Sequence, residues 1–282
     1  MTAPRVFTRE NAAGFLDPAV DPTLWTALIP AAGRGSRLGF DHPKILFPIA
    51  GRTILEWLVD LLQPLCGRFV FVLSPQGLAP VEQAASRLLP GRCAVALQSE
   101  PLGMADAIRR GLAQVETTHT LIVWGDQVAI KPESLEFSMR LHQGPAQPSA
   151  TCPTLWRDHP YIHFERTESG RVCRILQARE GDRMPARGES DSGVFLFRTE
   201  ALREFLPRLL NSPECIGAKT RELNFLPIFP LLEAEQLITA PIMTEAESVG
   251  VNSPADAAYL EQQLTEPRPQ GSDHGPAAHP RR

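Results

Sequence analysis

The sequence lacks the features that would place the chain in a membrane or an oxidising compartment. No apolar stretch approaches the roughly 20 residues that a helix needs to cross a bilayer. The first residues lack the cationic start and apolar run of a secretory signal. The five cysteines are scattered and have no CxxC spacing, so we expect reduced thiols and neither a disulfide framework nor a zinc site. The sequence therefore predicts a soluble, cytoplasmic protein with no membrane partner.

Excess positive charge is missing as well. The formal net charge is −4, and no basic patch or polybasic segment is present, so we expect no nucleic-acid partner. Lysine is scarce, because arginine supplies most of the positive charge and lysine occurs only at positions 44, 131 and 219. A lysine retained in such a sequence is a candidate functional residue, and Lys44 is the one that lies in a motif.

The first half of the chain alternates short apolar runs with segments of helical periodicity. This rhythm predicts an α/β fold with a doubly wound, mostly parallel sheet and right-handed crossovers. The predicted strands are 26–30, 68–73, 93–97 and 119–124, and the predicted helices between them are 53–62, 79–89 and 105–115.

From about residue 148 the pattern changes to strand-like pieces separated by turns, which predicts a small β-rich region beside the first sheet. These pieces are 149–155, 161–166, 171–177 and 193–197. Further along, the sequence predicts helices at 201–210 and 223–232, short strands at 238–243 and 248–251, and a closing helix at 254–264 capped by Ser253.

A glycine-rich segment follows the first predicted strand and reads Ala-Ala-Gly-Arg-Gly-Ser-Arg-Leu from Ala31, with Pro43-Lys44 soon after. Glycines in this position let backbone N–H groups approach phosphate oxygens closely. Basic side chains beside such a loop neutralise phosphate charge. The alternatives are an ordinary tight βα turn or a dinucleotide-binding fingerprint, although the third glycine is displaced to Gly39. A P-loop is excluded, because no Gly-Lys-Ser/Thr follows.

The pattern Leu-x-x-Ala-Ala-Gly-x-Gly-x-Arg-Leu followed by Pro-Lys resembles the signature of sugar-1-phosphate nucleotidyltransferases. This family includes N-acetylglucosamine-1-phosphate uridyltransferases and glucose-1-phosphate thymidylyltransferases, and the likeness extends in order from about Leu28 to Leu264. The resemblance implies a Rossmann-like nucleotidyltransferase fold and Mg²⁺-dependent transfer of a nucleotide to a sugar 1-phosphate, with release of pyrophosphate. It implies nucleotide contacts from the loop and catalytic roles for two basic residues and one carboxylate. The loop residues are Ala31, Ala32, Gly33, Gly35 and Ser36, and the catalytic residues are Arg37, Lys44 and Asp126.

A second segment, Gln98 to Ala107, resembles the family's Gln-x-x-x-x-Gly-Thr-Ala motif, whose glutamine and glycine hold the nucleotide base. The resemblance therefore implies that Gln98 and Gly103 bind the base. A glutamine amide offers a donor and an acceptor, which suits the imide edge of uracil or thymine. Met104 stands where the family usually has threonine, so one polar contact is expected to be missing.

Two oxygen-bearing side chains are candidate Mg²⁺ ligands. Asp126 ends a predicted parallel strand, where α/β sheets bind ligands, and a hard carboxylate suits Mg²⁺. Alone, such an aspartate is also typical of a turn or a helix cap. Asn252 lies in a stretch that matches the family's Val-Asn-x-x-x-Asp/Glu-Leu pattern, although it too is placed like a cap. The resemblance implies that Asp126 and Asn252 hold the metal together.

The region expected to bind the acceptor departs from the family. Ile162 replaces a glycine, Gln177 a carboxylate and Asp191 an asparagine. Arg179 stands where lysine is common, and its planar guanidinium is suited to a phosphate. The candidate acceptor-binding residues are Tyr161, Gln177, Arg179 and Asp191, and exposed strand residues without a ligand remain the alternative. His142 and His163 have no metal-ligand spacing around them, so we expect structural roles for both.

Three functions remain open on the sequence. The first is a uridylyl- or thymidylyltransferase acting on a sugar 1-phosphate, favoured by Gln98 and Gly103. The second is a cytidylyltransferase, or another nucleotidyltransferase, for a non-sugar phosphate or phosphonate, favoured by the changed acceptor region. The third is a catalytically silent regulatory homologue that binds nucleotide, against which the retention of Arg37, Lys44, Asp126 and Asn252 argues.

We divide the chain into an N-terminal extension (1–25), a nucleotide-binding half (26–147), an acceptor-binding half of the same domain (148–265) and a disordered tail (266–282). The expected partners are a nucleoside triphosphate and a phosphorylated small molecule. Family members often form oligomers, so self-association is a further expectation.

Overall fold

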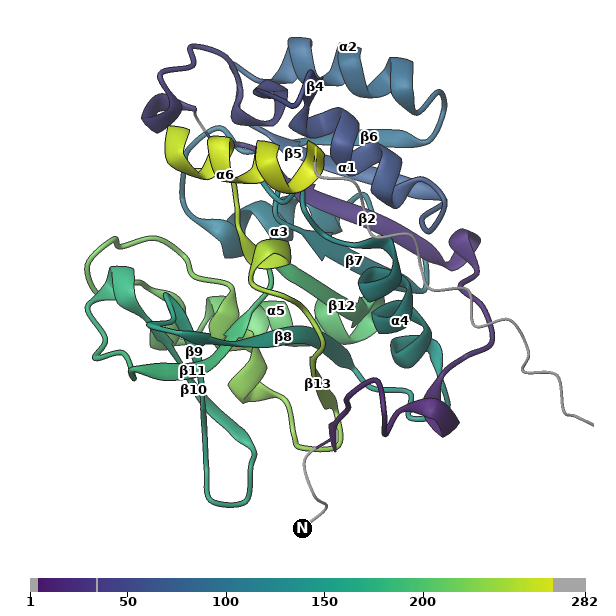
Figure 1. Ribbon diagram of the computed structural model, residues 1–282, viewed down its shortest axis with the longest axis vertical. Coiled ribbons are helices and arrows are strands. Elements are labelled where there is room, and N and C mark those ends of the chain that lie inside the picture. Colours follow the sequence, from purple (N-terminus) through teal and green to yellow (C-terminus); the bar gives the residue numbers. More distant parts are fainter. Residues whose placement is uncertain (1–4, 34, 266–282) are drawn as a thin grey trace, which may run out of the picture.

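The computed structural model describes residues 5–33 and 35–265, so Arg34 and the expected C-terminal tail lie outside the described residues. Its centre is a large sheet in the order β1-β13-β8-β12-β7-β2-β5-β6, with β11 paired to β8 (Figure 1). Four predicted strands run parallel from the middle of the sheet to its edge at β6, and in all of them except β6 nearly all side chains are buried. They are β2 (Trp25–Pro30), β5 (Arg68–Leu73), β6 (Cys93–Leu97) and β7 (His119–Val123).

The second half of the chain extends this same sheet. Strand β12 (Val194–Arg198) lies antiparallel between β7 and β8 (Ala150–Asp158), and β13 (Leu237–Pro241) follows parallel to β8. Two strands of the large sheet had no counterpart in the sequence analysis: β1 (Arg5–Val6), which pairs with β13, and β11 (Arg187–Asp191). The predicted α/β fold with a mostly parallel sheet is confirmed.

The β-rich region expected beside the sheet is only partly found there, because the pieces expected at 149–155 and 193–197 are strands β8 and β12 of the sheet itself. The remaining part does adjoin the sheet. It consists of the antiparallel hairpin of β9 (Ile162–Arg166) and β10 (Val172–Gln177), with β11 beside it (Figure 1). A second small pair, β3 (Pro48–Ile49) and β4 (Arg52–Thr53), precedes the first helix.

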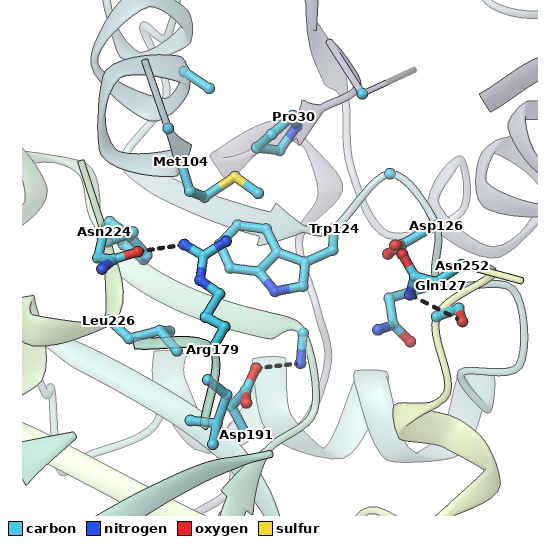
Figure 2. A pocket seen from close by; sticks show the side chains of 18 of the residues that line it. Pro30, Met104, Trp124, Asp126, Gln127, Arg179, Asp191, Asn224, Leu226 and Asn252 are labelled. Atoms are coloured by element: carbon cyan, nitrogen blue, oxygen red, sulfur yellow. Dashed lines mark hydrogen bonds between the residues drawn. The ribbon is translucent and has the colours of Figure 1, made fainter. Parts of the chain in front are cut away.

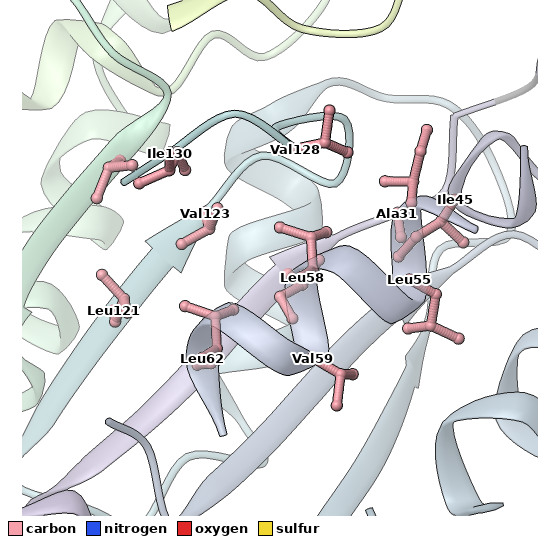
Figure 3. Packing of buried hydrophobic residues seen from close by; sticks show 14 of the residues in the cluster. Ala31, Ile45, Leu55, Leu58, Val59, Leu62, Leu121, Val123, Val128 and Ile130 are labelled. Atoms are coloured by element: carbon pink, nitrogen blue, oxygen red, sulfur yellow. The ribbon is translucent and has the colours of Figure 1, made fainter. Parts of the chain in front are cut away.

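Helices cover both faces of the sheet, because successive strand residues point to opposite sides and both sets are apolar. One face packs against α1 (Ile54–Leu62), α2 (Leu78–Leu88), α4 (Pro132–Gln143) and α6 (Pro254–Thr265). The other face packs against α3 (Met104–Leu112) and α5 (Thr199–Leu210). Figure 3 shows Leu58 and Leu62 of α1 lying over Leu121 and Val123 of β7. A helix between β7 and β8 was not predicted, although α4 fills that connection. In the described residues no helix is both long and apolar enough to cross a membrane.

Two other predicted elements were wrong. The helix expected at 223–232 is a short 3₁₀ helix, Leu226–Leu231, since Pro227 and Pro230 remove backbone donors that an α-helix needs. The strand expected at 248–251 is a 3₁₀ turn, Ala246–Ser248, followed by a single bridge between Gly250 and Gln127.

A buried ion pair fastens the β9–β10 hairpin to the sheet. Arg166 donates to Glu189 Oε2 from Nε (2.8 Å) and Nη2 (2.7 Å), and its Nη2 also donates to Thr239 Oγ1 (2.8 Å). The other oxygen of Glu189 accepts from the Thr154 hydroxyl at 2.8 Å. Strands β11 and β8 therefore hold the hairpin through one carboxylate, and Thr239 of β13 adds a separate bond to the Arg166 guanidinium.

We predict that Glu189→Ala lowers the free energy of unfolding by about 3–5 kcal/mol, because it leaves a partly buried guanidinium without its counter-charge. Urea unfolding followed by circular dichroism measures this loss. Glu204→Ala is the matched control, because it removes an exposed ion pair with Arg208 and should change stability by less than about 1 kcal/mol. Equal losses in the two variants would contradict the anchoring role.

Two buried histidines give the fold a pH dependence. His119 stacks on Trp25 with ring centroids 4.7 Å apart and meets the His142 ring at 5.1 Å. Burial, assisted by the charge of Arg198, lowers the pKa of His119 from 6.5 to about 4. Burial also lowers the pKa of His142, which bonds to the Thr151 hydroxyl through Nδ1 at 3.0 Å. Both histidines are therefore neutral in the folded protein at pH 7.

Between pH 6.5 and pH 4 His119 binds a proton in the unfolded chain but not in the folded one. The free energy of unfolding should therefore decrease as the pH is lowered through this window. The expected loss is about 3 kcal/mol for His119 alone. Urea unfolding at several pH values should show a smaller loss in His119→Phe than in the wild type. His159→Asn, which removes an exposed imidazole, serves as the control, and a slope unaffected by His119→Phe would refute the assignment.

Candidate functional site

A cavity of about 650 Å³ opens where β2 and β7 end, at the carboxyl edge of the parallel strands. Ligands bind at this edge in open α/β sheets. Both halves of the chain line it, including almost all of the residues singled out from the sequence. The predicted residues in its wall are Ala31, Ala32, Gly33, Arg37, Lys44, Gln98, Gly103, Asp126, Tyr161, Gln177, Arg179, Asp191 and Asn252.

Gly35 and Ser36 are not part of this wall. Gly35 is buried, and a Cβ on it would lie 3.1 Å from the carbonyl oxygen of Phe40, so it serves the close packing of the loop. Ser36 is exposed and begins a 3₁₀ turn that carries Arg37, an exposed side chain in the cavity wall. The neighbouring turn places buried Ile45 in the core, and Lys44 beside it lines the cavity.

Lys44 joins two oxygens from distant parts of the chain. Its ammonium donates to Asp126 Oδ2 at 2.6 Å and to Asn252 Oδ1 at 3.1 Å, and the Lys44 and Asp126 side chains are mostly buried. Figure 2 shows Asp126 and Asn252 close together on one side of the cavity. A carboxylate and an amide oxygen that converge on one cation form a donor set that suits Mg²⁺, with phosphates and waters completing its shell. Among the described residues no group of three His, Cys, Asp or Glu side chains has metal-binding geometry, so protein ligands alone do not enclose a metal.

Close backbone approach brings Asn252 to Asp126. The Val251 N–H donates to the Asp126 carbonyl at 3.0 Å, and a Cβ on Gly250 would lie only 2.9 Å from the Asp126 carboxyl carbon. Gly125 is equally constrained, because a Cβ there would lie 2.6 Å from the carbonyl oxygen of Pro30. Glycine at these two positions lets the ends of β2 and β7 and the segment before α6 meet.

Gln98 is buried and its amide nitrogen is already engaged. Nε2 donates to the Gly103 carbonyl at 3.0 Å and to Asp106 Oδ2 at 3.1 Å. Asp106 in turn pairs with Arg109 (2.7 Å) and Arg110 (2.6 Å). This network fixes the orientation of the amide, so the carbonyl oxygen of Gln98 is the group left to meet a ligand.

Gly103 packs against the segment 222–224. Its φ of +111° favours glycine, and a Cβ would lie 2.5 Å from the Leu223 nitrogen. Leu223 pairs with this loop, because its N–H donates to the Leu102 carbonyl at 2.7 Å and its carbonyl accepts from Ala105 at 2.9 Å. The segment 222–224 is thereby fastened to the loop that precedes α3.

Arg179 is held by the same segment. Its guanidinium donates to Asn224 Oδ1 and contacts Glu222 Oε2 at 3.1 Å and Glu180 Oε1 at 3.4 Å (Figure 2). Burial alone raises the pKa of Glu180, but hydrogen bonds from Thr220, Lys219 and Asn224 outweigh it and lower the pKa to about 2. Glu180 is therefore ionised beside Arg179.

Asp191 is partly buried in the cavity wall at the end of β11, and its Oδ2 accepts from the Gly193 N–H at 3.1 Å. Burial raises its pKa to about 6, against the lowering effect of this hydrogen bond and of the Arg157 charge. Gln177 is buried, whereas Tyr161 is 55% exposed at the rim. His142 and His163 do not line the cavity; His163 Nδ1 lies 3.1 Å from the Glu189 carbonyl oxygen.

The sequence analysis missed several polar residues in the wall. Gln127 directly follows Asp126, so the same motif could have identified it as a candidate. The others lie in segments without a recognisable motif, and only their folded position brings them to the cavity. They are Arg157, Ser190, Glu222, Asn224 and Ser248.

Comparison with known proteins finds a matching family model and curated relatives. The family model for the MobA-like NTP transferase domain matches residues 27–191. The bifunctional proteins GlmU of Carboxydothermus hydrogenoformans and Aromatoleum aromaticum are 26% and 30% identical, each over 83% of this chain and over 51% and 50% of their own lengths. The chain thus spans about half the length of these curated relatives.

The inositol-1-phosphate CTP transferase from T. maritima shares the fold with a TM-score of 0.63, at 17% identity, over 88% of this chain and 98% of that one. These matches confirm the nucleotidyltransferase resemblance that the motifs indicated. Since the family model covers more than half of the sequence, the chain belongs to the family of MobA-like NTP transferase domains.

Proposed function

We propose that the protein is a Mg²⁺-dependent nucleotidyltransferase that joins a nucleoside triphosphate to a sugar 1-phosphate and releases pyrophosphate. The observation that carries this proposal is the convergence of Lys44, Asp126 and Asn252 at the carboxyl edge of the sheet, within one cavity shared by both halves. A silent homologue would have no reason to keep this arrangement together with Arg37.

In the proposed reaction an oxygen of the acceptor phosphate attacks the α-phosphorus in line, and the bond to the β-phosphate oxygen breaks as pyrophosphate leaves. The N–H groups of the glycine loop and Arg37 hold the β- and γ-phosphates, while Lys44 stabilises the charge that develops at the α-phosphate. Mg²⁺ on Asp126 and Asn252 would neutralise the two phosphates that approach one another. The chain's contribution is positioning and charge stabilisation, without a covalent intermediate.

For the base, we favour UTP or dTTP. Nε2 of Gln98 is bound to Gly103 and Asp106, so its carbonyl oxygen is left to accept a hydrogen bond from the ring N–H of uracil or thymine. The same oxygen also suits the amino group of cytosine. A CTP-dependent enzyme with a non-sugar phosphate or phosphonate acceptor is therefore the second candidate, favoured by Ile162, Gln177 and Asp191 and by the fold shared with a CTP transferase.

The deciding experiment measures pyrophosphate release with Mg²⁺ across a grid of nucleoside triphosphates and phosphorylated acceptors. Release with UTP or dTTP and a sugar 1-phosphate would support the first proposal, and release only with CTP and a non-sugar phosphate the second. Nucleotide binding without release from any pair would favour the silent homologue.

We predict that Lys44→Ala and Asp126→Ala each lower kcat about 100- to 1000-fold, because each removes a charge that acts on the transferring phosphate. Pyrophosphate release measures the loss, and a far-UV spectrum like that of the wild type shows that the fold is retained. Lys131→Ala is the matched control, since Lys131 is exposed at the start of α4 and outside the cavity wall. Near-normal turnover of either variant would remove that residue from the mechanism.

We predict that Gln98→Ala weakens nucleotide binding about 5- to 100-fold, because the base loses its hydrogen-bond acceptor. Calorimetry with a non-hydrolysable nucleoside triphosphate measures this change. Inorganic tripolyphosphate, which has no base, should bind the variant as it binds the wild type. Gln114→Ala, an exposed change, controls for the substitution itself, and equal weakening of tripolyphosphate would exclude a base contact.

A further inference from the structure

The two arginines on the acceptor side differ in how their charge is balanced. Arg179, the residue that the sequence analysis favours for the acceptor phosphate, lies between the carboxylates of Glu180 and Glu222 and donates to Asn224. The negative charge of the two carboxylates is larger than the single positive charge of the guanidinium. Each of the three guanidinium nitrogens already contacts an oxygen of Glu180, Glu222 or Asn224. A phosphate dianion that approached Arg179 would meet a group of net negative charge.

Arg157 has a single, more distant carboxylate partner. It extends from the far end of β8, its side chain is 28% exposed, and it lines the cavity. Its Nε is buried and has no hydrogen-bond acceptor among the described residues. The carboxylate paired with it is that of Glu245, 3.8 Å away and itself 61% exposed. A buried charged donor without an acceptor costs free energy that an incoming anion would recover.

Arg157 also lies beside the segment that leads to Asn252. Its Nε is 3.8 Å from Oε1 of Glu245, which directly precedes the turn Ala246–Ser248 before Asn252. Figure 2 shows Arg179 reaching toward Asn224, away from Asp126 and Asn252. An anion beside Arg157 would thus lie on the side where transfer is proposed.

We propose that Arg157 binds the phosphate or phosphonate group of the acceptor. Arg179 instead holds the segment 222–224 against its own turn, Ala178–Glu180. This inference rests on the proposed function for the identity of the second substrate. The planar guanidinium contacts two oxygens of the anion at once, a geometry that lysine does not reproduce. The acceptor is thereby selected for a terminal group with at least two free anionic oxygens.

The test measures binding of inorganic phosphate by ³¹P NMR titration, with Mg²⁺ and a saturating non-hydrolysable UTP or CTP analogue present to occupy the triphosphate site. We expect Arg157→Met to weaken phosphate binding about 10- to 100-fold and Arg157→Lys to restore it only in part. Binding of the nucleotide analogue, measured separately by calorimetry, should stay within about twofold of the wild type.

Arg187→Met is the matched control, because Arg187 lies on the adjacent strand β11 with its side chain 72% exposed and outside the cavity wall. It should bind phosphate as the wild type does, and Arg179→Met should lose less affinity than Arg157→Met. Unchanged phosphate binding in Arg157→Met, or none in the wild type, would overturn the inference. An equal loss of nucleotide binding would assign Arg157 to the triphosphate instead. Failure of the proposed function would appear differently, as absence of analogue binding in the wild type or as absence of pyrophosphate release with every substrate pair.

Discussion

The contact of the Lys44 ammonium with Asp126 and Asn252 is the interaction around which the cavity is arranged. The three residues are 82 and 208 positions apart in the chain, yet two hydrogen bonds join them. They come from the glycine-rich region after β2, the end of β7 and the segment before α6. The packing of the sheet and its helices fixes where each segment lies. These three polar groups therefore meet only in the folded protein, because they are far apart in the sequence.

Close packing of backbone is the condition for this convergence. Gly125 and Gly250 have no room for a Cβ, because the Pro30 carbonyl and the Asp126 carboxyl lie in that space. A Cβ on Gly103 would likewise meet the backbone of Leu223, and this contact fastens the loop before α3 to the segment that holds Arg179. The two sides of the cavity are therefore linked by backbone contacts.

The parallel centre of the sheet and most of the wall could be predicted from the sequence, because apolar periodicity and short motifs are local properties. Gly33, Lys44 and Asp126 stand next to the ends of predicted strands, and strand ends gather at one edge of a parallel sheet. Arg157 and Asn224 could not be predicted in this way. Arg157 sits in a strand without a motif, and Asn224 meets Arg179 across 45 residues through a fold that pattern reading does not supply. The helix expected at 223–232 was wrong for a different, local reason. Its apolar periodicity was given more weight than Pro227 and Pro230, which interrupt an α-helix.

The geometry around Lys44 also constrains how a metal would enter. The Lys44 ammonium, 2.6 Å from Asp126 Oδ2 and 3.1 Å from Asn252 Oδ1, lies at the pair of oxygens that would hold the proposed Mg²⁺. If they hold it, Lys44 would give up at least part of its bonding to these oxygens. A triphosphate supplies the new partner for the ammonium, because the side chain belongs to the same cavity as the glycine loop. Mg²⁺ would then balance the charge of Asp126, and the Lys44 ammonium would balance part of the charge of the triphosphate. Binding of the metal and binding of the nucleotide should therefore favour one another.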